Sequence, residues 1–320
     1  MRLLLVVLGI LASQAFAQEW PAKAVRLIVP FPAGGSADLI PRVVGERLSA
    51  KWGQAVVVEN RPGAAGNIGA EAVYRAEPDG YILLAAPPAP LVINRLLYKN
   101  LSYDSTQFAP VTVIAAIPNV LLVHPKTGAS SIAELIELAK KNPGKLNYAS
   151  QGGGTTSHLT AELFKVMAGG ADGPLRITHV PYRGTAPALA DLVAGQVEMM
   201  CDNLGVSLPH VRSGKLKALG VGSVKRVATL PDVPALGESL PGFVSIAWFG
   251  IVAPPRTPPA IAEKIFAGIA EVLKQPEVLK RLADLSAEPM GLGPAETAAF
   301  MKQDSERWGA VIRAAGVRLD

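Results

Sequence analysis

Short apolar runs alternate with amphipathic helical patterns along almost the whole chain, and this alternation most constrains its fold. The run Val25–Val29 precedes a predicted helix at 37–51, and Val56–Asn60 precedes another at 68–75. Several of these runs are continuous rather than alternating with polar residues, which is typical of parallel strands buried on both faces. The pattern therefore predicts an α/β fold whose sheet is covered by helices on both faces.

Two of the predicted strands run directly into a glycine-rich turn and a helix start. Gly34-Gly35-Ser36 follows the first strand, and the turn 151–157 follows a strand predicted at 146–149. Such a turn points unpaired backbone N–H groups and the positive end of a helix dipole at one place, which suits an anion. Two turns of this kind predict a clamp for a small carboxylated ligand.

The first 17 residues match a secretory signal peptide. Arg2 supplies a positive start, residues 3–11 are apolar, and Ala15-Phe16-Ala17 is a small-x-small cleavage site. The apolar run is well short of the roughly 20 residues that a spanning helix needs. We therefore expect cleavage after Ala17 and a mature periplasmic protein that does not itself span the membrane.

Composition narrows the function classes. The chain of 320 residues is 49% hydrophobic, and its single cysteine, Cys201, cannot form an internal disulfide. Stability must then come from a large buried core, and Cys201 is predicted to lie in a core strand. The formal charge of +5 is scattered rather than gathered on one stripe, so we expect no nucleic-acid partner.

The pattern of elements resets after residue 110. Strands are predicted at 111–115 and 120–124, separated by a Pro-Asn turn, and a second α/β block follows them. A strand-like run at 244–252 leads into helices at 259–274, 276–285 and 294–315, which return to cover a sheet. This predicts two α/β domains, 18–118 plus 247–320 and 119–246, with two hinge crossovers and a ligand cleft between them.

Signatures of common enzymes are missing from the sequence. No phosphate-binding Gly-x-x-x-x-Gly-Lys motif occurs, and Gly34-Gly35-Ser36-Ala37-Asp38 lacks the second glycine of a nucleophile elbow. The four histidines have no metal-ligand spacing. We therefore predict no enzyme activity, no cofactor and no metal. His158, in the first turn of the helix after the second glycine turn, can either face the cleft or be structural.

The motifs resemble those of the Bug family, the extracytoplasmic solute-binding receptors of tripartite tricarboxylate transporters. The resemblance covers essentially the whole mature chain in order and spacing. It is carried by Trp20-Pro21-x-Lys23, Arg26-Leu27-Ile28-Val29-Pro30-Phe31-Pro32-x-Gly34-Gly35, Val58-Glu59-Asn60-Arg61-Pro62-Gly63-Ala64-x-Gly66-Asn67-Ile68-Gly69, Pro78-Asp79-Gly80-Tyr81, Tyr148-Ala149-Ser150, Gly152-x-Gly154-Thr155, His179-Val180-Pro181-Tyr182-Arg183-Gly184, Asp202-Asn203 and Leu230-Pro231-Asp232-Val233-Pro234.

This resemblance implies a type II periplasmic-binding-protein fold that closes on its ligand. It also implies that backbone amides of the two glycine loops, with two ordered waters, hold one ligand carboxylate. Carried over to this chain, the first loop is Phe31, Pro32, Ala33, Gly34, Gly35, Ser36 and Asp38, and the second is Gln151, Gly152, Gly153, Gly154, Thr155, Thr156 and Ser157. The facing walls and hinge are Tyr182, Arg183, Gly184, Asp202 and Asn203.

Individual residues in these loops allow more than one interpretation. Phe31 is expected to stack over the ligand rather than only fill the core. Asp38 suits an anion site poorly, so it is expected to cap the helix or hold the loop, unless it takes an ammonium group. Arg183 can pair bidentately with a ligand carboxylate or remain solvated. The pair Trp248-Phe249 at the second crossover is expected to pack in the hinge.

One stretch departs from the family pattern. Where the family usually carries small hydroxylic residues, this chain has Ala86-Pro87-Pro88-Ala89-Pro90-Leu91. A wall that includes Pro87 and lacks hydroxyls is apolar and stiff. We therefore expect a ligand with an apolar or aromatic body rather than a hydroxylated acid such as citrate.

Two functions remain open from the sequence. The first is a monomeric receptor that captures a small carboxylate and hands it to the membrane permease subunits of a tripartite tricarboxylate transporter. The alternative is a periplasmic sensory receptor that presents its ligand-bound form to a signalling partner. Both would use the same ligand-driven closure, so the sequence does not separate them.

Overall fold

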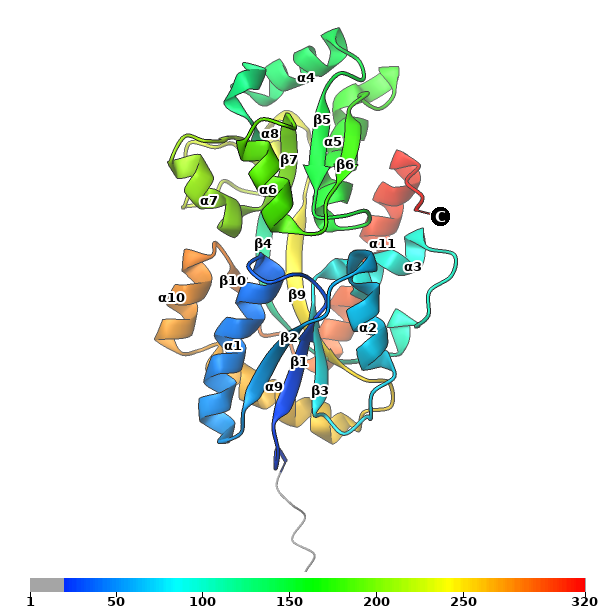
Figure 1. The fold of residues 1–320 in the computed structure, drawn as a ribbon, viewed down its shortest axis with the longest axis vertical. Coiled ribbons are helices and arrows are strands. Elements are labelled where there is room, and N and C mark those ends of the chain that lie inside the picture. Colours follow the sequence, from blue (N-terminus) through cyan, green and yellow to red (C-terminus); the bar gives the residue numbers. More distant parts are fainter. Residues whose placement is uncertain (1–19, 320) are drawn as a thin grey trace, which may run out of the picture.

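The computed structural model describes residues 20–319, so the predicted signal peptide and its cleavage site lie outside the described residues. The predicted α/β class is confirmed. Two lobes lie end to end, and the long strands β4 (Ala109–Val123) and β9 (Ile246–Ala253) connect them (Figure 1). Within residues 20–319, no helix is both long and apolar enough to cross a membrane.

The lower lobe is built on a mixed sheet. Its order is β2-β1-β3-β9-β4, in which β1 pairs parallel with β2 and β3, and β9 runs antiparallel to β3 and β4. The elements of this part, besides β4 and β9, are β1 (Val25–Val29), α1 (Ser36–Trp52), β2 (Val56–Asn60), α2 (Asn67–Tyr74), β3 (Ile82–Ala86) and α3 (Asn94–Leu97).

The upper lobe repeats the α/β principle with a smaller sheet. β5 pairs parallel with β6 and β7, and β7 and β8 each run antiparallel to the last part of β4. Its elements are α4 (Ile132–Lys141), β5 (Asn147–Ser150), α5 (Thr156–Gly169), β6 (Thr178–Pro181), α6 (Thr185–Val193), β7 (Met199–Asn203), α7 (Leu204–Arg212), β8 (Lys217–Val221) and α8 (Leu236–Ser239).

The predicted break at Pro118-Asn119 is wrong, because β4 is one continuous strand. Up to Pro118 it pairs with β9, and from Asn119 onward it pairs with β7, joined by β8 from Val120. Proline donates no ladder hydrogen bond, so it normally ends a strand. Here it lies where β4 changes partners.

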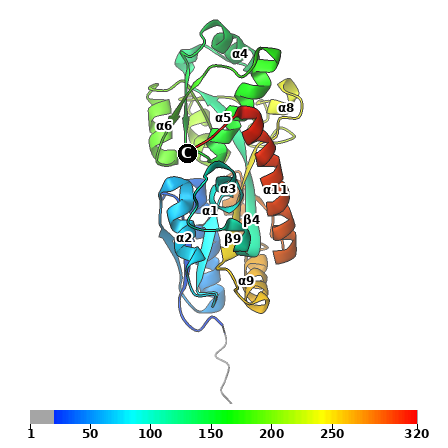
Figure 2. The same ribbon diagram turned by 90° about the vertical axis from the view of Figure 1, so that its right-hand side faces the viewer.

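The C-terminal elements cover the lower lobe and then reach beyond it. α9 (Pro259–Val272) and α10 (Pro276–Asp284) pack against α1, and the short β10 (Glu288–Pro289) pairs with β4. α11 (Pro294–Ala315) packs against β4 and also against α5 of the upper lobe, and the last described residues lie beside that lobe (Figure 2). This third contact between the lobes was not predicted.

The core runs through both lobes along the connecting strands. One cluster of buried side chains includes Ile117 and Val120 of β4, Ala247 of β9 and Met200 of β7. Cys201 is buried in the upper-lobe cluster, at the core strand position that its sequence context predicts. The connecting strands are therefore packed like core strands rather than like exposed linkers.

Candidate functional site

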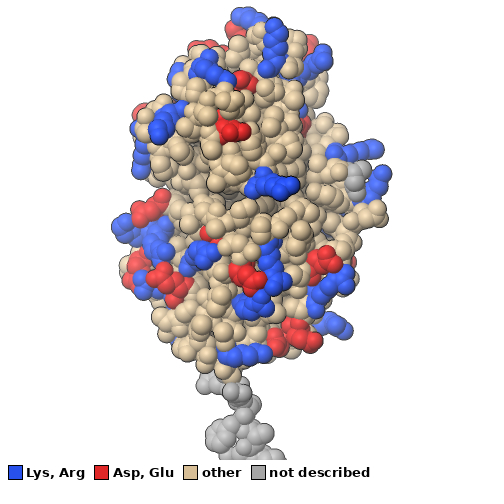
Figure 3. All heavy atoms as spheres, in the orientation of Figure 1, with Lys and Arg blue, Asp and Glu red and all other residues tan. Residues whose placement is uncertain are grey.

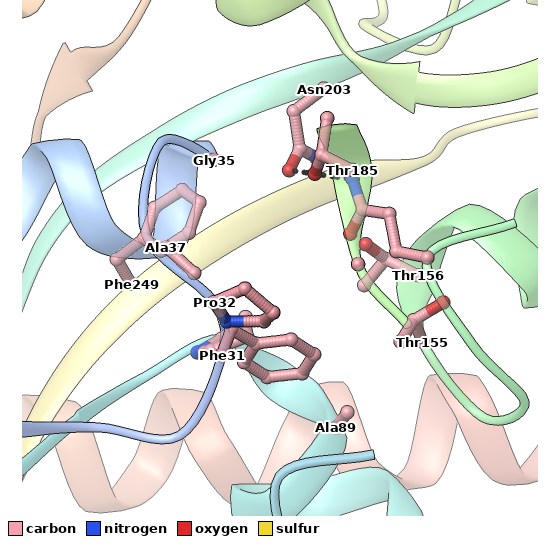
Figure 4. Close-up of a pocket in the computed structure, with 13 residues that line it drawn as sticks. Phe31, Pro32, Gly35, Ala37, Ala89, Thr155, Thr156, Thr185, Asn203 and Phe249 are labelled. Carbon is pink, nitrogen blue, oxygen red and sulfur yellow. Dashed lines mark hydrogen bonds between the residues drawn. The ribbon is translucent and has the colours of Figure 1, made fainter. Parts of the chain in front are cut away.

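A cavity lies between the lobes where the first glycine turn of the lower lobe faces the loops of the upper lobe (Figure 4). We call it the inner cavity. Its lower-lobe lining is Phe31, Pro32, Gly35, Ala37, Pro87, Ala89 and Phe249, and its upper-lobe lining is Gln151, Thr155, Thr156, Gly184, Thr185 and Asn203.

The two walls of the inner cavity differ in chemistry. Every lower-lobe lining residue is apolar or glycine, whereas every upper-lobe lining residue except Gly184 presents a hydroxyl or amide side chain. Figure 4 shows the rings of Phe31 and Phe249 on one wall and Thr155, Thr156 and Asn203 on the other. Because no lining side chain carries a charge, an anion here would depend on neutral donors and on the backbone.

Helix N-termini supply that backbone contribution. α1 begins at Ser36, α5 at Thr156 and α6 at Thr185, each at or next to a lining residue, and α7 follows the lining residue Asn203. The first N–H groups of a helix have no intrahelical acceptor and carry partial positive charge. Four helix starts around one cavity suit a carboxylate without a cationic side chain.

Asp38 holds the first glycine turn from behind. Its Oδ2 accepts a hydrogen bond from the backbone N–H of Gly34 at 3.0 Å, and its Oδ1 accepts from Arg42 at 2.9 Å and Asn60 at 2.8 Å. Burial alone would raise the pKa of Asp38, but the bonds from Arg42, Gly34 and Asn60 outweigh burial and keep that pKa below its usual value. The carboxylate thus has a loop-holding position and does not line the inner cavity.

His158 supports the second glycine turn in the same way. Its Nδ1 accepts the backbone N–H of Gly154 at 3.0 Å, and its ring stacks on His179 with centroids 4.1 Å apart. Burial lowers the pKa of His158 to about 4, with Lys165 adding to the effect, and burial lowers that of His179 to about 3. A neutral Nδ1 can accept a hydrogen bond, so the structure assigns His158 a structural role.

Asp202 and Asn203 tie the inner cavity to the strands that join the lobes. Asp202 accepts hydrogen bonds from Gln151 and from the Ser207 hydroxyl, and burial raises its pKa to about 6. The Asn203 amide donates to Asn119 Oδ1 at 3.1 Å, and Asn119 donates to the Ser245 hydroxyl at 2.9 Å. A lining side chain is therefore linked to β4 and to the segment entering β9.

The lobes approach each other closely at two glycines. A Cβ atom on Gly35 would lie 3.1 Å from Thr185 Oγ1, and one on Gly184 would lie 3.1 Å from the Pro32 ring. The inner cavity is correspondingly narrow, with about 20 Å³ open to the centre of a water-sized sphere, which is room for about one water molecule. A dicarboxylate would need the lobes or the lining side chains to move apart.

The predicted site residues fall into three groups. Phe31, Pro32, Gly35, Pro87, Gln151, Thr155, Thr156, Gly184 and Asn203 line the inner cavity. Gly152, Tyr182 and Arg183 line a neighbouring hollow instead. Ala33, Gly34, Ser36, Asp38, Gly153, Gly154, Ser157 and Asp202 line neither. Which of these residues touches a ligand stays a prediction.

Three lining residues were not predicted: Ala37, Thr185 and Phe249. Ala89 also lines the inner cavity and lies in the stretch 86–91 that was predicted to form an apolar wall, although only Pro87 was named from it as a site residue. Thr185 directly follows the Tyr182-Arg183-Gly184 motif and starts α6, so its position next to a helix N-terminus could have identified it. Phe249 was expected to pack in the hinge, whereas it lines the inner cavity. Its neighbour Trp248 is turned the other way and donates to Asp304 of α11 at 2.7 Å. Successive side chains of a strand point to opposite faces, so Phe249 faces the inner cavity while Trp248 faces α11.

No group of three or more His, Cys, Asp or Glu side chains able to hold a metal ion is found in the described part of the chain, residues 20–319. The lining of the inner cavity also contains no acidic or histidine side chain.

Two α/β lobes joined by paired strands around a cavity define a periplasmic binding protein of the type II class. The chain belongs to the tripartite tricarboxylate transporter family receptors, whose family model matches residues 40–317. The predicted resemblance to the Bug family is thereby confirmed. The protein BugT of Bordetella pertussis is 36% identical over 99% of this chain and 98% of its own length.

Solved structures of the same class are closely similar. Rpa4515 of R. palustris with adipate has a TM-score of 0.89 at 37% identity, covering 93% of this chain and 99% of that one. MatC from Rhodopseudomonas palustris with bound malate has a TM-score of 0.85 at 32% identity, covering 92% and 100%. The chain is therefore a periplasmic solute-binding receptor in family and in fold.

Proposed function

We propose that this receptor captures a small carboxylate with an apolar body in the inner cavity and delivers it to the membrane permease of a tripartite tricarboxylate transporter. The observation that carries the proposal is the division of the inner cavity into a polar upper wall with helix N-termini and an apolar lower wall. The carboxylate would lie against the upper wall and the first helical turn of α1. The body of the ligand would pack on Phe31, Pro87 and Phe249.

Delivery would depend on closure of two domains, 18–118 plus 247–320 and 119–246. This division is supported by β4, whose strand partners change at Pro118. Ligand in the cavity would add contacts to both lobes and favour the closed arrangement, which is the form that a permease could distinguish. We further propose export, cleavage after Ala17 and a monomeric mature protein.

Two relatives support the ligand class, because one solved structure contains adipate and another contains malate. Both ligands are small dicarboxylates. The apolar wall of this chain favours the unhydroxylated body of adipate, since a malate hydroxyl facing Phe31 and Pro87 would lose hydrogen bonds to water without regaining them.

A thermal-shift panel of adipate, terephthalate, citrate and glutamate tests the proposal. We expect adipate or terephthalate to raise the melting temperature most, because a ligand that binds only the folded protein stabilises it by mass action. Stabilisation by citrate alone would contradict the apolar-body assignment. Capture of permease subunits from detergent-solubilised membranes, with and without the stabilising acid, then tests delivery; capture that does not depend on the acid would contradict it.

A further inference from the structure

A second and larger hollow lies beside the inner cavity, also between the lobes. We call it the outer chamber. It has a volume of about 540 Å³. Phe31, Pro32, Gln151 and Gly184 line both spaces, so these residues form the partition between them. The remaining lining comes from Pro30, the loop 62–66 of the lower lobe, and Gly152, Tyr182 and Arg183 of the upper lobe.

Only one charged side chain lines the outer chamber, that of Arg183. The lower-lobe lining consists of proline, phenylalanine, alanine and glycine. The two other polar side chains are already engaged: the Tyr182 hydroxyl donates to Asp191 at 2.7 Å, and the Gln151 amide donates to Asp202. The middle of the face, between the lobes, carries few charged side chains (Figure 3).

Arg183 is exposed, and among residues 20–319 no hydrogen-bonding or ion-pair partner is found for its guanidinium. A guanidinium presents a planar fork of donors that matches a carboxylate bidentately. Arg42 and Arg307 show the contrast, since each pairs with an aspartate of its own helix. The cation of the outer chamber is therefore free to receive an anion from outside the chain.

The inner cavity has the complementary limitation. It has room for about one water molecule, and none of its lining side chains is cationic. Two carboxylates placed there together would repel each other with only neutral donors to offset the repulsion. A ligand with two carboxylates therefore binds more favourably when one carboxylate lies in the inner cavity and the other in the outer chamber.

We propose that the ligand is an unbranched dicarboxylate that spans both spaces, with one carboxylate in the inner cavity and the other on Arg183 in the outer chamber. This inference rests on the proposed function, because it takes the inner cavity as the first carboxylate site. The methylene chain crosses the partition beside Phe31 and Pro32. Arg183 thereby selects dicarboxylates over monocarboxylates of equal length.

The test compares acids that differ only in the second carboxylate. Isothermal titration calorimetry is run with the diacids from succinate to suberate and with the monoacids from butyrate to octanoate. We expect the wild-type protein to bind its preferred diacid at least about tenfold more tightly than the matched monoacid. Arg183→Gln should reduce this preference by about tenfold and leave the monoacid affinity unchanged. Arg183→Lys should retain part of the preference, because lysine keeps the charge but not the fork.

Arg212→Gln is the matched control, because Arg212 is exposed in the last turn of α7 and lines neither space. It removes the same charge and should leave every affinity unchanged. Diacid affinity should also fall with added salt in the wild-type protein and much less in Arg183→Gln, since an exposed ion pair is screened.

The possible failures are distinguishable. Equal binding of diacids and monoacids by the wild-type protein, or an unchanged diacid preference in Arg183→Gln, would overturn the role of Arg183 and leave the proposed function standing. A parallel loss of diacid and monoacid affinity in Arg183→Gln would show a structural role instead. Absence of binding for every carboxylate in the wild-type protein would overturn the proposed function as well.

Discussion

Gly35 shows how a single missing side chain permits contact between the lobes. Its backbone has φ −86°, a conformation open to any residue, so backbone strain does not require glycine here. Space is tight, because a Cβ would lie 3.1 Å from Thr185 Oγ1 and the threonine side chain would have to shift to admit it. Gly34 is the opposite case. Nothing lies within 4 Å of its would-be Cβ, but its φ of +89° disfavours other residues.

Replacing these two glycines by alanine should therefore affect different properties: ligand affinity for Gly35 and stability of the free protein for Gly34. Gly35→Ala should obstruct closure and weaken ligand binding about tenfold, since forcing an atom into a packed contact costs about 1–3 kcal/mol. Its ligand-free stability should fall by less than about 1 kcal/mol, because the cap position tolerates alanine at that cost. Gly34→Ala should lower the stability of the free protein by about 1–2 kcal/mol. Calorimetric titration and urea unfolding measure the two effects.

Thr185→Ala supplies the matched test of the contact. In the double variant Gly35→Ala, Thr185→Ala the obstructing hydroxyl is gone, so Gly35→Ala should weaken binding much less in the Thr185→Ala background than in the wild-type protein. The coupling energy from this double-mutant cycle is expected to be about 1 kcal/mol or more. Additive effects of the two substitutions would contradict a direct contact between these positions in the ligand-bound protein.

At the scale of elements, the second glycine turn depends on two neutral histidines. The rings of His158 and His179 stack between Tyr148 on β5 and the start of α5, near Glu162 and Lys165. Their pKa values, about 4 and about 3, lie below the ordinary value of 6.5. The unfolded chain therefore binds more protons than the folded protein between these limits. Stability from this pair is present above pH 6.5 and is lost as pH falls toward 4.

We expect the wild-type protein to lose stability at acid pH because of these two histidines. A variant in which both are replaced by side chains that do not titrate should lose less. Asparagine at 158 and glutamine at 179 keep a hydrogen-bonding group near the ring nitrogens used here, so His158→Asn with His179→Gln should show a smaller loss of unfolding free energy between pH 7 and pH 5. Urea unfolding at both pH values measures this. Asp202, with its pKa raised to about 6, has the opposite sign but is common to both proteins. Equal pH dependence in both would refute the histidine assignment.

The elements show what local sequence could predict. The strand–turn–helix units at Gly34 and Gly152 were predictable because the apolar run, the glycines and the helical period lie next to one another in sequence. The continuity of β4 through Pro118 was not, since it depends on β7, β8 and β9, which follow much later in the chain. The hydrogen-bond chain from Asn203 through Asn119 to Ser245 was missed for the same reason.

The candidate site divides in the same way. The position of the motifs in the sequence predicted which residues lie in the two glycine loops. It did not predict which way each side chain points. Asp38 and His158 lie behind their loops because their polar atoms meet Gly34 and Gly154. Phe249 lies in the inner cavity because Trp248, one residue earlier, has its partner on α11. Partners that are distant in sequence thus decide which neighbour faces the ligand.

At the scale of the whole molecule, the C-terminal segment joins the lobes independently of the strands. α11 packs against β4 and α5, and Leu319, a few residues beyond it, reaches the second glycine turn. A Cβ on Gly153 would lie 3.0 Å from a Leu319 methyl group, and one on Gly154 would lie 3.0 Å from Leu97 and 3.3 Å from Leu319. These two glycines therefore face the C-terminal segment, and a bulky residue at Gly154 would disturb Leu97 and Leu319 first.

Leu319 should consequently favour the arrangement in which the lobes are together. It is half-buried, so removing most of its side chain is expected to cost about 1 kcal/mol, less than a fully buried leucine. If the contact exists only when the lobes are closed, Leu319→Ala lowers the stability of the closed arrangement by this energy. Leu319→Ala should then weaken ligand binding about fivefold, while the ligand-free melting temperature changes little.

Leu279→Ala, at a leucine of α10 that is 39% exposed, is the matched control and should bind like the wild-type protein. Small-angle scattering without ligand should show Leu319→Ala to be no more compact than the wild-type protein. Unchanged affinity, or a lower melting temperature with affinity retained, would place the Leu319 contact within the resting fold rather than in closure.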